Sequence, residues 1–436
     1  MNFAHCAALG LLILAGSVGA EEKYGLVEGY TGDSARLENP TNIDADLNAS
    51  FPQNNAVFDS SVPKNWFAWK QGLYADTGLK LGMSYQSLYQ HASETLTGND
   101  TAWAGWLLVE AKWDAFNKGE DYQGGLVATL DWRHTIGGNS APGFFQLDTG
   151  SQWASDFSFV DWDVWFPALY WEQWLDKDKF VLRVGNQVAP QFIDFFRFKD
   201  SRVSFSSGPF TAAAQSIPSP QPGFGVSFRW TPIEASEFYV AGTVNDSNAV
   251  VNEFGWGDIF ENGQFFYGVE FGYSWRRSRS DFDHLHLLVF YADETDMLAP
   301  VFPNKAGGGF KLAGSKQWDR LVAFASYTYN THEGGGFGTT LSKQVITAGL
   351  AVQRPLNVGG EVGVGATWAE PLDDVTLAVV PQRPSPADQW GMEFYWRILL
   401  TQDLWITPSL QFVVNPTFNA AANSIVIPGL KFRWFL

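Results

Sequence analysis

The sequence predicts an all-β fold, a closed transmembrane antiparallel β-barrel of about sixteen strands. Segments that alternate apolar and polar residues follow one another along most of the 436 residues. The connections between them alternate between long and short, and aromatic residues, 16% of the chain, gather at the segment ends. Alternating strands with short turns at one end, long loops at the other and aromatic girdles are typical of bacterial outer-membrane barrels.

Residues 1–20 are expected to be a secretory signal peptide. Leu9 to Val18 form a short apolar core, and small residues precede Glu21. The only cysteine, Cys6, lies in this segment, so the mature chain is expected to lack disulfides and thiolate metal sites. No later apolar run reaches the length of about 18 residues that a transmembrane helix requires.

Composition and motifs exclude several classes of function. The net charge of −18 argues against nucleic acid, whose phosphates require a basic surface. His284 and His286 share a strand face, but no third ligand is near them in the sequence, so no metal site is expected. The triple-glycine runs lack the lysine and helix of a phosphate-binding loop. We therefore expect no catalytic residues and no cofactor.

The chain divides into the signal peptide, a polar periplasmic segment at 21–65 and a barrel at 66–436. The polar segment is expected to be a tail or to tuck against the barrel. Trp66 to Asp76 is predicted to form a short helix. The predicted strands are 79–91, 103–114, 123–134, 156–172, 179–187, 222–231, 235–244, 265–276, 283–291, 307–312, 318–330, 344–354, 358–368, 389–401, 404–415 and 424–436.

The connections and the strand faces give the predicted orientation. Barrels of this kind keep short turns and both termini in the periplasm and long loops outside. Leu430, Phe432 and Trp434 of the last strand point one way, whereas Lys431 and Arg433 point the other. Long loops are expected near 92–102, 135–155, 188–221, 245–264, 292–306, 331–343, 369–388 and 416–423.

Charged side chains are expected on the inner wall of the early strands. Asp131 and Arg133 share one face, Asp161 and Asp163 share another, and Arg183 continues the series. Charges of both signs in a narrow aqueous passage offer the hydrogen-bond donors and acceptors that sugar hydroxyls need. The alternative is a salt-bridge network that fills the lumen and only stabilises it.

The longest loop, 188–221, is unusually aromatic for a segment in water. Folding this third external loop into the lumen would shelter Phe195 and Phe196 and bring Arg197 and Arg202 to the passage. Aromatic stacking with arginine donors would then form a sugar-selective constriction. The alternative is a surface loop that packs on neighbouring loops.

These residues resemble the carbohydrate-selective porins of Gram-negative outer membranes, from about Trp66 onward. Residues 69–80 resemble the family's helix and first strand, and 182–187 with Phe195, Phe196 and Arg197 resemble its third-loop approach. Residues 408–416 with 429–431 resemble its closing strand pair. The chain departs from the family by ending in Leu436 in place of Phe, and its third loop matches only loosely.

The resemblance implies gradient-driven diffusion of mono- and short oligosaccharides into the periplasm, with the arginines and aromatics of 183–202 at the pore constriction. Expected partners are sugars as solutes, outer-membrane lipid and the barrel-assembly machinery, and both monomer and trimer stay open. Two alternatives remain. One is a secreted β-rich glycan-binding protein or glycoside hydrolase, with Asp161 and Asp163 as its carboxylate pair. The other is a general, anion or aromatic-compound porin.

Overall fold

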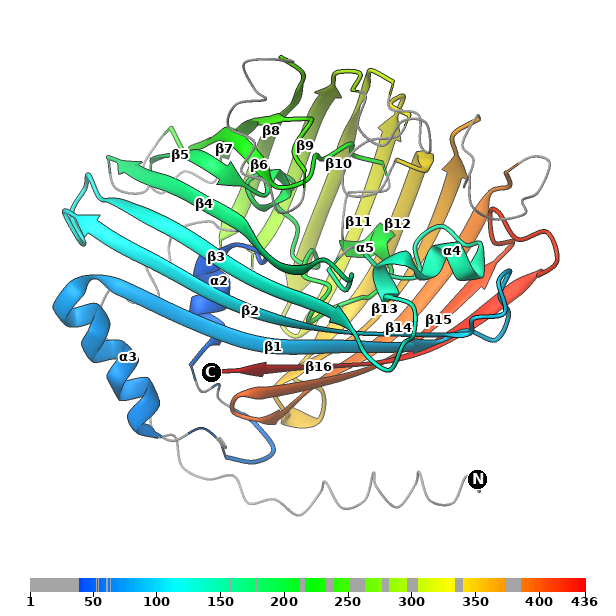
Figure 1. Cartoon of the computed structure of the whole chain (residues 1–436), viewed down its shortest axis with the longest axis horizontal. Coiled ribbons are helices and arrows are strands. Elements are labelled where there is room, and N and C mark those ends of the chain that lie inside the picture. Colours follow the sequence, from blue (N-terminus) through cyan, green and yellow to red (C-terminus); the bar gives the residue numbers. More distant parts are fainter. Residues whose placement is uncertain are drawn as a thin grey trace.

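The computed structural model describes residues 39–436 apart from 52, 54, 60–61, 63, 157, 177–178, 212–215, 233–237, 251–262, 277–281, 296–304, 334–339 and 374–385. The predicted signal peptide and residues 21–38 therefore lie outside the described residues. Sixteen antiparallel strands form a closed barrel in which neighbours in the chain pair and β16 closes against β1 (Figure 1). The predicted strand number and the closed architecture are confirmed, which excludes a β-sandwich.

The barrel strands follow one another from Leu79 to Phe435, and short helices lie before them and in the loops. The strands are β1 (Leu79–His91), β2 (Thr101–Phe116), β3 (Gly124–Thr135), β4 (Asp163–Leu175), β5 (Phe180–Gln187), β6 (Gly223–Trp230), β7 (Phe238–Asp246), β8 (Phe265–Arg276), β9 (Phe282–Ala292), β10 (Gly307–Trp318), β11 (Leu321–Asn330), β12 (Ser342–Gln353), β13 (Gly360–Pro371), β14 (Gln389–Thr401), β15 (Leu404–Val414) and β16 (Ser424–Phe435). The α-helices are α2 (Ile43–Ala49), α3 (Lys64–Thr77), α4 (Phe145–Thr149) and α5 (Gly208–Thr211). None of the helices among the described residues is long and apolar enough to cross a membrane.

Short and long connections alternate around the barrel as predicted, so that it has a short-turn end and a long-loop end. Most strand boundaries differ from the prediction by a few residues at most, and two differ by more. Residues 313–317 continue β10, because the turn is made further on by Asp319, whose φ is 52°. β4 begins at Asp163 and not at 156, because the preceding residues belong to a loop that buries Phe159 and Val160.

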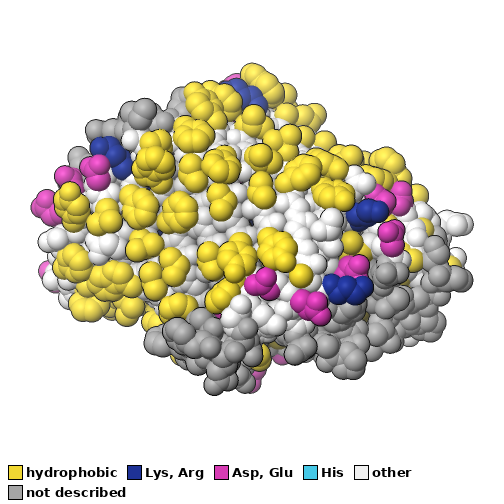
Figure 2. Space-filling model, turned by 90° about the horizontal axis from the view of Figure 1, so that it is seen from above, with side chains coloured by type: hydrophobic (Ala, Val, Ile, Leu, Met, Phe, Trp, Pro, Cys, Tyr) yellow, Lys and Arg dark blue, Asp and Glu magenta, His cyan; other side chains and the backbone are white. Residues whose placement is uncertain are grey.

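The strands present an apolar outer surface and a polar inner wall. In β2, Glu110 and Lys112 are buried, whereas Trp113 on the opposite face is 46% exposed. In β16, Arg433 is buried and Leu430 is 49% exposed. Apolar side chains cover much of the outer surface in the view of Figure 2. This period of two gives a barrel that is suited to lipid outside and to water and polar solutes inside.

The described part of the polar N-terminal segment enters the barrel. Ile43 and Leu47, four residues apart on α2, pack against Val127 and Tyr170, which face inward from β3 and β4. The chain then leaves across the short-turn end, where the backbone N–H of Gln53 donates to the carbonyl of Gln402 at 2.8 Å. α3 lies outside the barrel and leads into β1 (Figure 1). This helix is longer at both ends than the helix predicted at 66–76.

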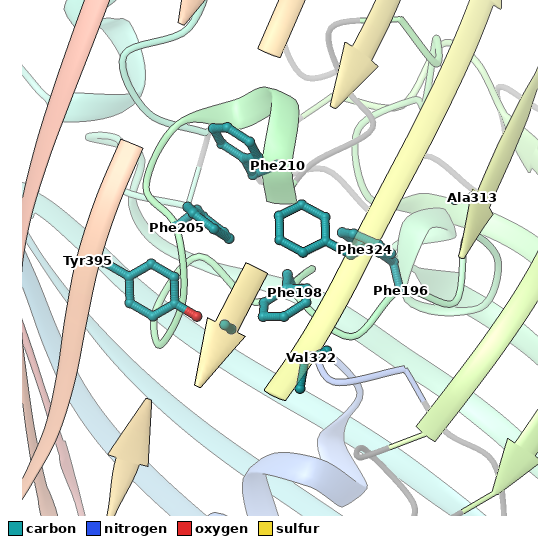
Figure 3. Packing of buried hydrophobic residues seen from close by; sticks show 9 residues of the cluster. Phe196, Phe198, Phe205, Phe210, Ala313, Val322, Phe324 and Tyr395 are labelled. Carbon is teal, nitrogen blue, oxygen red and sulfur yellow. The ribbon is translucent and has the colours of Figure 1, made fainter. Parts of the chain in front are cut away.

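The longest loop packs against inward-facing side chains of the opposite wall (Figure 3). The ring centroids of Phe198 and Phe324 lie 4.6 Å apart, as do those of Phe205 and Tyr395. Burying a phenylalanine side chain contributes roughly 1.5–3 kcal/mol. The cluster comprises Phe196, Phe198, Phe205 and Phe210 of the loop with Ala313, Val322, Phe324, Ala351 and Tyr395 of β10, β11, β12 and β14.

Two carboxylates of the barrel wall also hold this loop. Glu393 of β14 accepts the backbone N–H groups of Ser206 at 2.7 Å and Ser207 at 2.8 Å. Glu270 of β8 accepts the backbone N–H groups of Asp194 and Phe195 near the beginning of the loop. Both carboxylates are fully buried, and hydrogen bonds to a charged group are the strong ones. The loop is therefore attached to two separate strands.

Candidate functional site

Among the described residues, charged side chains border two cavities in the barrel interior, one toward each end. The first cavity, about 160 Å³, is lined near the long-loop end by Trp106, Glu110, Asp131, Arg133 and Trp165, among others. The second cavity, about 230 Å³, is lined near the short-turn end by side chains that include Arg197, Glu361, Arg397, Trp405 and Phe435. Asp46 and Asp200 border both cavities, so the two meet at these carboxylates.

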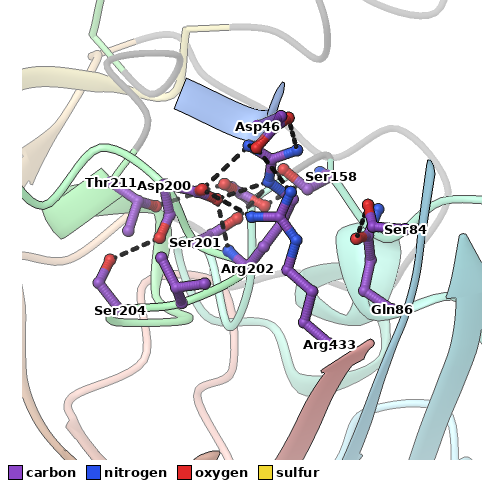
Figure 4. A network of polar contacts seen from close by, with 12 residues as sticks. Asp46, Ser84, Gln86, Ser158, Asp200, Ser201, Arg202, Ser204, Thr211 and Arg433 are labelled. Atoms are coloured by element: carbon purple, nitrogen blue, oxygen red, sulfur yellow. Dashed lines mark hydrogen bonds and ion pairs between the residues drawn. The ribbon is translucent and has the colours of Figure 1, made fainter. Parts of the chain in front are cut away.

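A buried network of two aspartates and two arginines (Figure 4) includes the two carboxylates that border both cavities. Arg202 donates to Asp46 at 2.6 Å and to Asp200 at 2.7 Å. Arg433 donates to the same two carboxylates at 2.6 and 3.2 Å. Burial alone would raise the pKa of Asp200, but Arg202 and Arg433 beside it hold the pKa of that carboxyl below its usual value. The network thus joins α2, the loop and β16 through two carboxylates and two guanidinium groups.

Aromatic rings surround an arginine in the first cavity. The Arg133 guanidinium lies 4.0 Å from the ring centroid of Trp106 and 5.1 Å from that of Trp165. The same guanidinium donates to Asp131 through Nη2 at 2.6 Å and through Nε at 3.0 Å. Among the described residues, no hydrogen-bond partner meets the Trp165 indole N–H or the Thr129 hydroxyl, and both side chains line this cavity. The cavity therefore combines apolar ring faces with donors and acceptors that a solute can use.

The other predicted site residues divide between the cavities and the surrounding packing. Arg202 lines the first cavity. Arg197 lines the second cavity and donates to Gln317 at 2.6 Å. Arg183 is buried outside both cavities and donates to Glu172 at 2.7 Å. Phe195 and Phe196 are buried in apolar clusters, where they position the loop without bordering either of these two cavities.

Asp161 and Asp163 do not share the inner wall, which corrects the prediction. Both are exposed, and Asp161 accepts hydrogen bonds from the backbone N–H of Thr135 at 3.2 Å and from its hydroxyl at 2.8 Å. The reason is the later beginning of β4. Residue 161 belongs to the loop, and Asp163 adopts a φ of 57°, so the strand alternation does not reach this pair.

Asp46, Trp106, Trp165 and Arg433 are site residues that sequence reasoning did not identify. The periodicity placed Arg433 on the polar face of the last strand but gave no partner for it. A local signal for α2 exists, since Asn42 is an N-cap whose side chain accepts the N–H of Asp44, and Ile43 and Leu47 follow at helical spacing. That signal indicates a helix, although not its location in the lumen.

A closed sixteen-stranded barrel with an apolar outer surface and a charged interior defines the architectural class of the porins. Within that class, residues 305–435 match the model of the carbohydrate-selective porin, OprB family. The match confirms the predicted resemblance over this part of the chain.

Solved structures agree in fold. The chain is similar to the high-pH structure of OprB from Pseudomonas putida, with a TM-score of 0.63, 12% identity and coverage of 88% of this chain and 99% of that one. The low-pH structure of the same porin gives a TM-score of 0.51, 10% identity and coverage of 88% and 100%. At sequence identities of 10% and 12%, these similarities establish the fold and nothing further. No curated protein matches the chain.

Proposed function

We propose that this protein is an outer-membrane porin through which sugars diffuse passively into the periplasm. The observation that carries the proposal is the first cavity, in which Arg133 and Asp131 lie among the rings of Trp106 and Trp165 inside a closed barrel. The family match over residues 305–435 supports the same solute class.

The chemistry of this cavity suits a sugar. Aromatic rings can stack on the C–H face of a pyranose, while its hydroxyls need both donors and acceptors. Trp106 and Trp165 supply ring faces, and the Trp165 indole N–H and the Thr129 hydroxyl supply hydrogen-bonding groups. Because Arg133 and Asp131 already bond each other, a sugar must compete with that ion pair. Binding is therefore weak, as release and onward diffusion require.

The charges in the cavity favour neutral solutes over anions. Of the described residues, five carboxylates and three cationic side chains line the first cavity. A passage selective for anions would need an excess of positive charge. The carboxylates are Asp46, Glu110, Asp131, Asp156 and Asp200, and the cations are Arg133, Lys199 and Arg202. This count argues against the anion-porin alternative.

Single-channel recording tests the proposed sugar site. Conductance of the purified protein in planar bilayers is expected to fall as glucose or a maltooligosaccharide is added. Trp106→Ala removes a stacking face, and we expect the half-blocking sugar concentration to rise about tenfold, equivalent to about 1.4 kcal/mol.

Trp132→Ala is the matched control for this experiment. Trp132 lies in the adjacent strand β3 but is 42% exposed on the outer surface. The variant should therefore leave sugar block unchanged. Conductance that is indifferent to every sugar, in a protein that forms stable channels, would contradict the solute class while leaving the barrel intact.

The remaining assignments extend the same proposal. Residues 1–20 direct secretion, the barrel-assembly machinery inserts 66–436, and the apolar surface contacts outer-membrane lipid of a Gram-negative bacterium. A folded barrel should migrate differently from the boiled protein in detergent gels and should be absent from the soluble fraction. Cross-linking of the native protein would separate monomer from trimer.

A further inference from the structure

One carboxylate of the N-terminal segment lies where the two cavities meet. Asp46 of α2 borders both of them, and it accepts hydrogen bonds from Arg202 of the long loop and Arg433 of β16. Its position is therefore within the passage, although it precedes the first barrel strand in the chain.

Contacts that do not involve Asp46 keep the segment in this place. The Asn39 side chain donates to the backbone carbonyls of Ile193 at 3.1 Å and Asp194 at 3.2 Å in the long loop. On the barrel side, Lys112 of β2 donates to Asp44 at 2.8 Å. With the apolar packing of α2 against β3 and β4, these bonds attach the segment to the loop and to the wall. A change at Asp46 can therefore alter the constriction without releasing the helix.

We propose that residues 39–50 form one side of the constriction and that Asp46 sets its charge selectivity. The inference rests on the proposed passage through the lumen, and it adds a specificity-determining residue from outside the barrel strands and the long loop. With Asp46 ionised, two carboxylates balance Arg202 and Arg433. Without that charge, Asp200 is left as the ion-pair partner of both arginines, and the constriction carries one negative charge less. Asp46 thereby keeps the passage open to neutral and cationic solutes and unfavourable to anions.

The first test measures ion selectivity without any sugar. D46N has nearly the shape of the parent side chain and removes one negative charge. A charge at a narrow passage acts on cations and anions in opposite directions. We expect the K⁺/Cl⁻ permeability ratio, obtained from the reversal potential across a KCl gradient, to fall about fivefold. An unchanged ratio in D46N channels would overturn the proposal.

D44N is the matched control on the same helix. Asp44 borders neither cavity, and the amide oxygen of the D44N side chain can still accept from Lys112, which also keeps the carboxylate of Glu172 at 2.7 Å. The permeability ratio of this variant should stay near that of the parent protein. A shift in D44N as large as that in D46N would contradict a role specific to Asp46.

D46C provides a second test that does not depend on how the amide of D46N affects folding. In D46C, a negatively charged methanethiosulfonate should restore the cation preference, whereas a positively charged reagent should shift permeability further toward Cl⁻. Opposite effects of the two reagents on one channel require residue 46 to lie in the conducting path. Currents insensitive to both reagents would place the segment outside the path and sink the proposal. Loss of sugar block with these ion effects intact would instead count against the proposed function.

Discussion

The backbone clamp at Glu393 determines how firmly the long loop is held inside the barrel. Its carboxylate accepts two N–H groups, from Ser206 and Ser207, and it is fully buried in β14. E393A removes both acceptors and leaves two N–H groups to find water or remain unbonded. We expect this change to favour local opening of the loop at these residues, while the phenylalanine cluster keeps the rest in place.

The size of the effect follows from the two bonds. A hydrogen bond to a charged group contributes about 1.5–3 kcal/mol, so losing two lowers the local opening free energy by about 3–6 kcal/mol. Even the lower figure corresponds to roughly a hundredfold faster amide exchange. E393Q retains one carbonyl acceptor and should show an intermediate effect.

Hydrogen exchange of the detergent-solubilised barrel measures this directly at Ser206 and Ser207. E270A provides a reciprocal control, because Glu270 binds the loop at Asp194 and Phe195 instead. Faster exchange should appear at 206–207 in E393A and at 194–195 in E270A. Equal protection at 206–207 in E393A and the parent protein would refute the clamp.

Two further predictions concern α3 and the end of β16, which meet where Lys70 contacts Leu436. Burial lowers the pKa of Lys70, which donates to Ser50 and to a main-chain oxygen of Leu436, from 10.5 to about 7. Because this folded-state pKa lies below the unfolded value, the folded state binds fewer protons between about pH 7 and 10.5, and stability should rise with pH across that window. Thermal unfolding should show this rise in the parent protein, and K70M should flatten it. Deleting Trp434 to Leu436 removes the pairing of this strand end with Tyr85 and Ser84 of β1. The amount of folded, detergent-resistant barrel on gels should therefore fall, whereas the conductance of any barrel that still folds should change less.

The barrel could be predicted because its signal is local. Alternation with a period of two marks each strand and each face without reference to any other part of the chain. Glu110 and Trp113 of β2 illustrate this, since their spacing alone places one inside and the other outside. Where a loop residue interrupted the alternation, as before Asp163, the same reasoning failed.

The site could be predicted less completely than the barrel, because its contacts join residues that are far apart in the sequence. Composition indicated that Arg202 could reach the lumen, but its partner Asp46 lies 156 residues away and carries no pattern that points to it. The aromatic residues around Arg133 were also hidden, since a tryptophan on an inner wall and one on the lipid face look alike in a sequence. Trp106 lies on the inner face of β2 and Trp132 on the outer face of the neighbouring strand β3.

The contact between Arg433 and Asp46 links barrel closure to completion of the buried charge network. It joins residues 387 positions apart, so the last strand of the barrel holds a helix that is synthesised before the first. Closing so long a segment is entropically unfavourable, and it happens only once β16 pairs with β1. A chain that stops before β16 leaves Asp46 and Asp200 with Arg202 as their one remaining partner in this network. The same strand therefore closes the barrel against β1 and supplies the second arginine of this network, so a barrel left open at this strand also lacks half of the positive charge that pairs with Asp46 and Asp200.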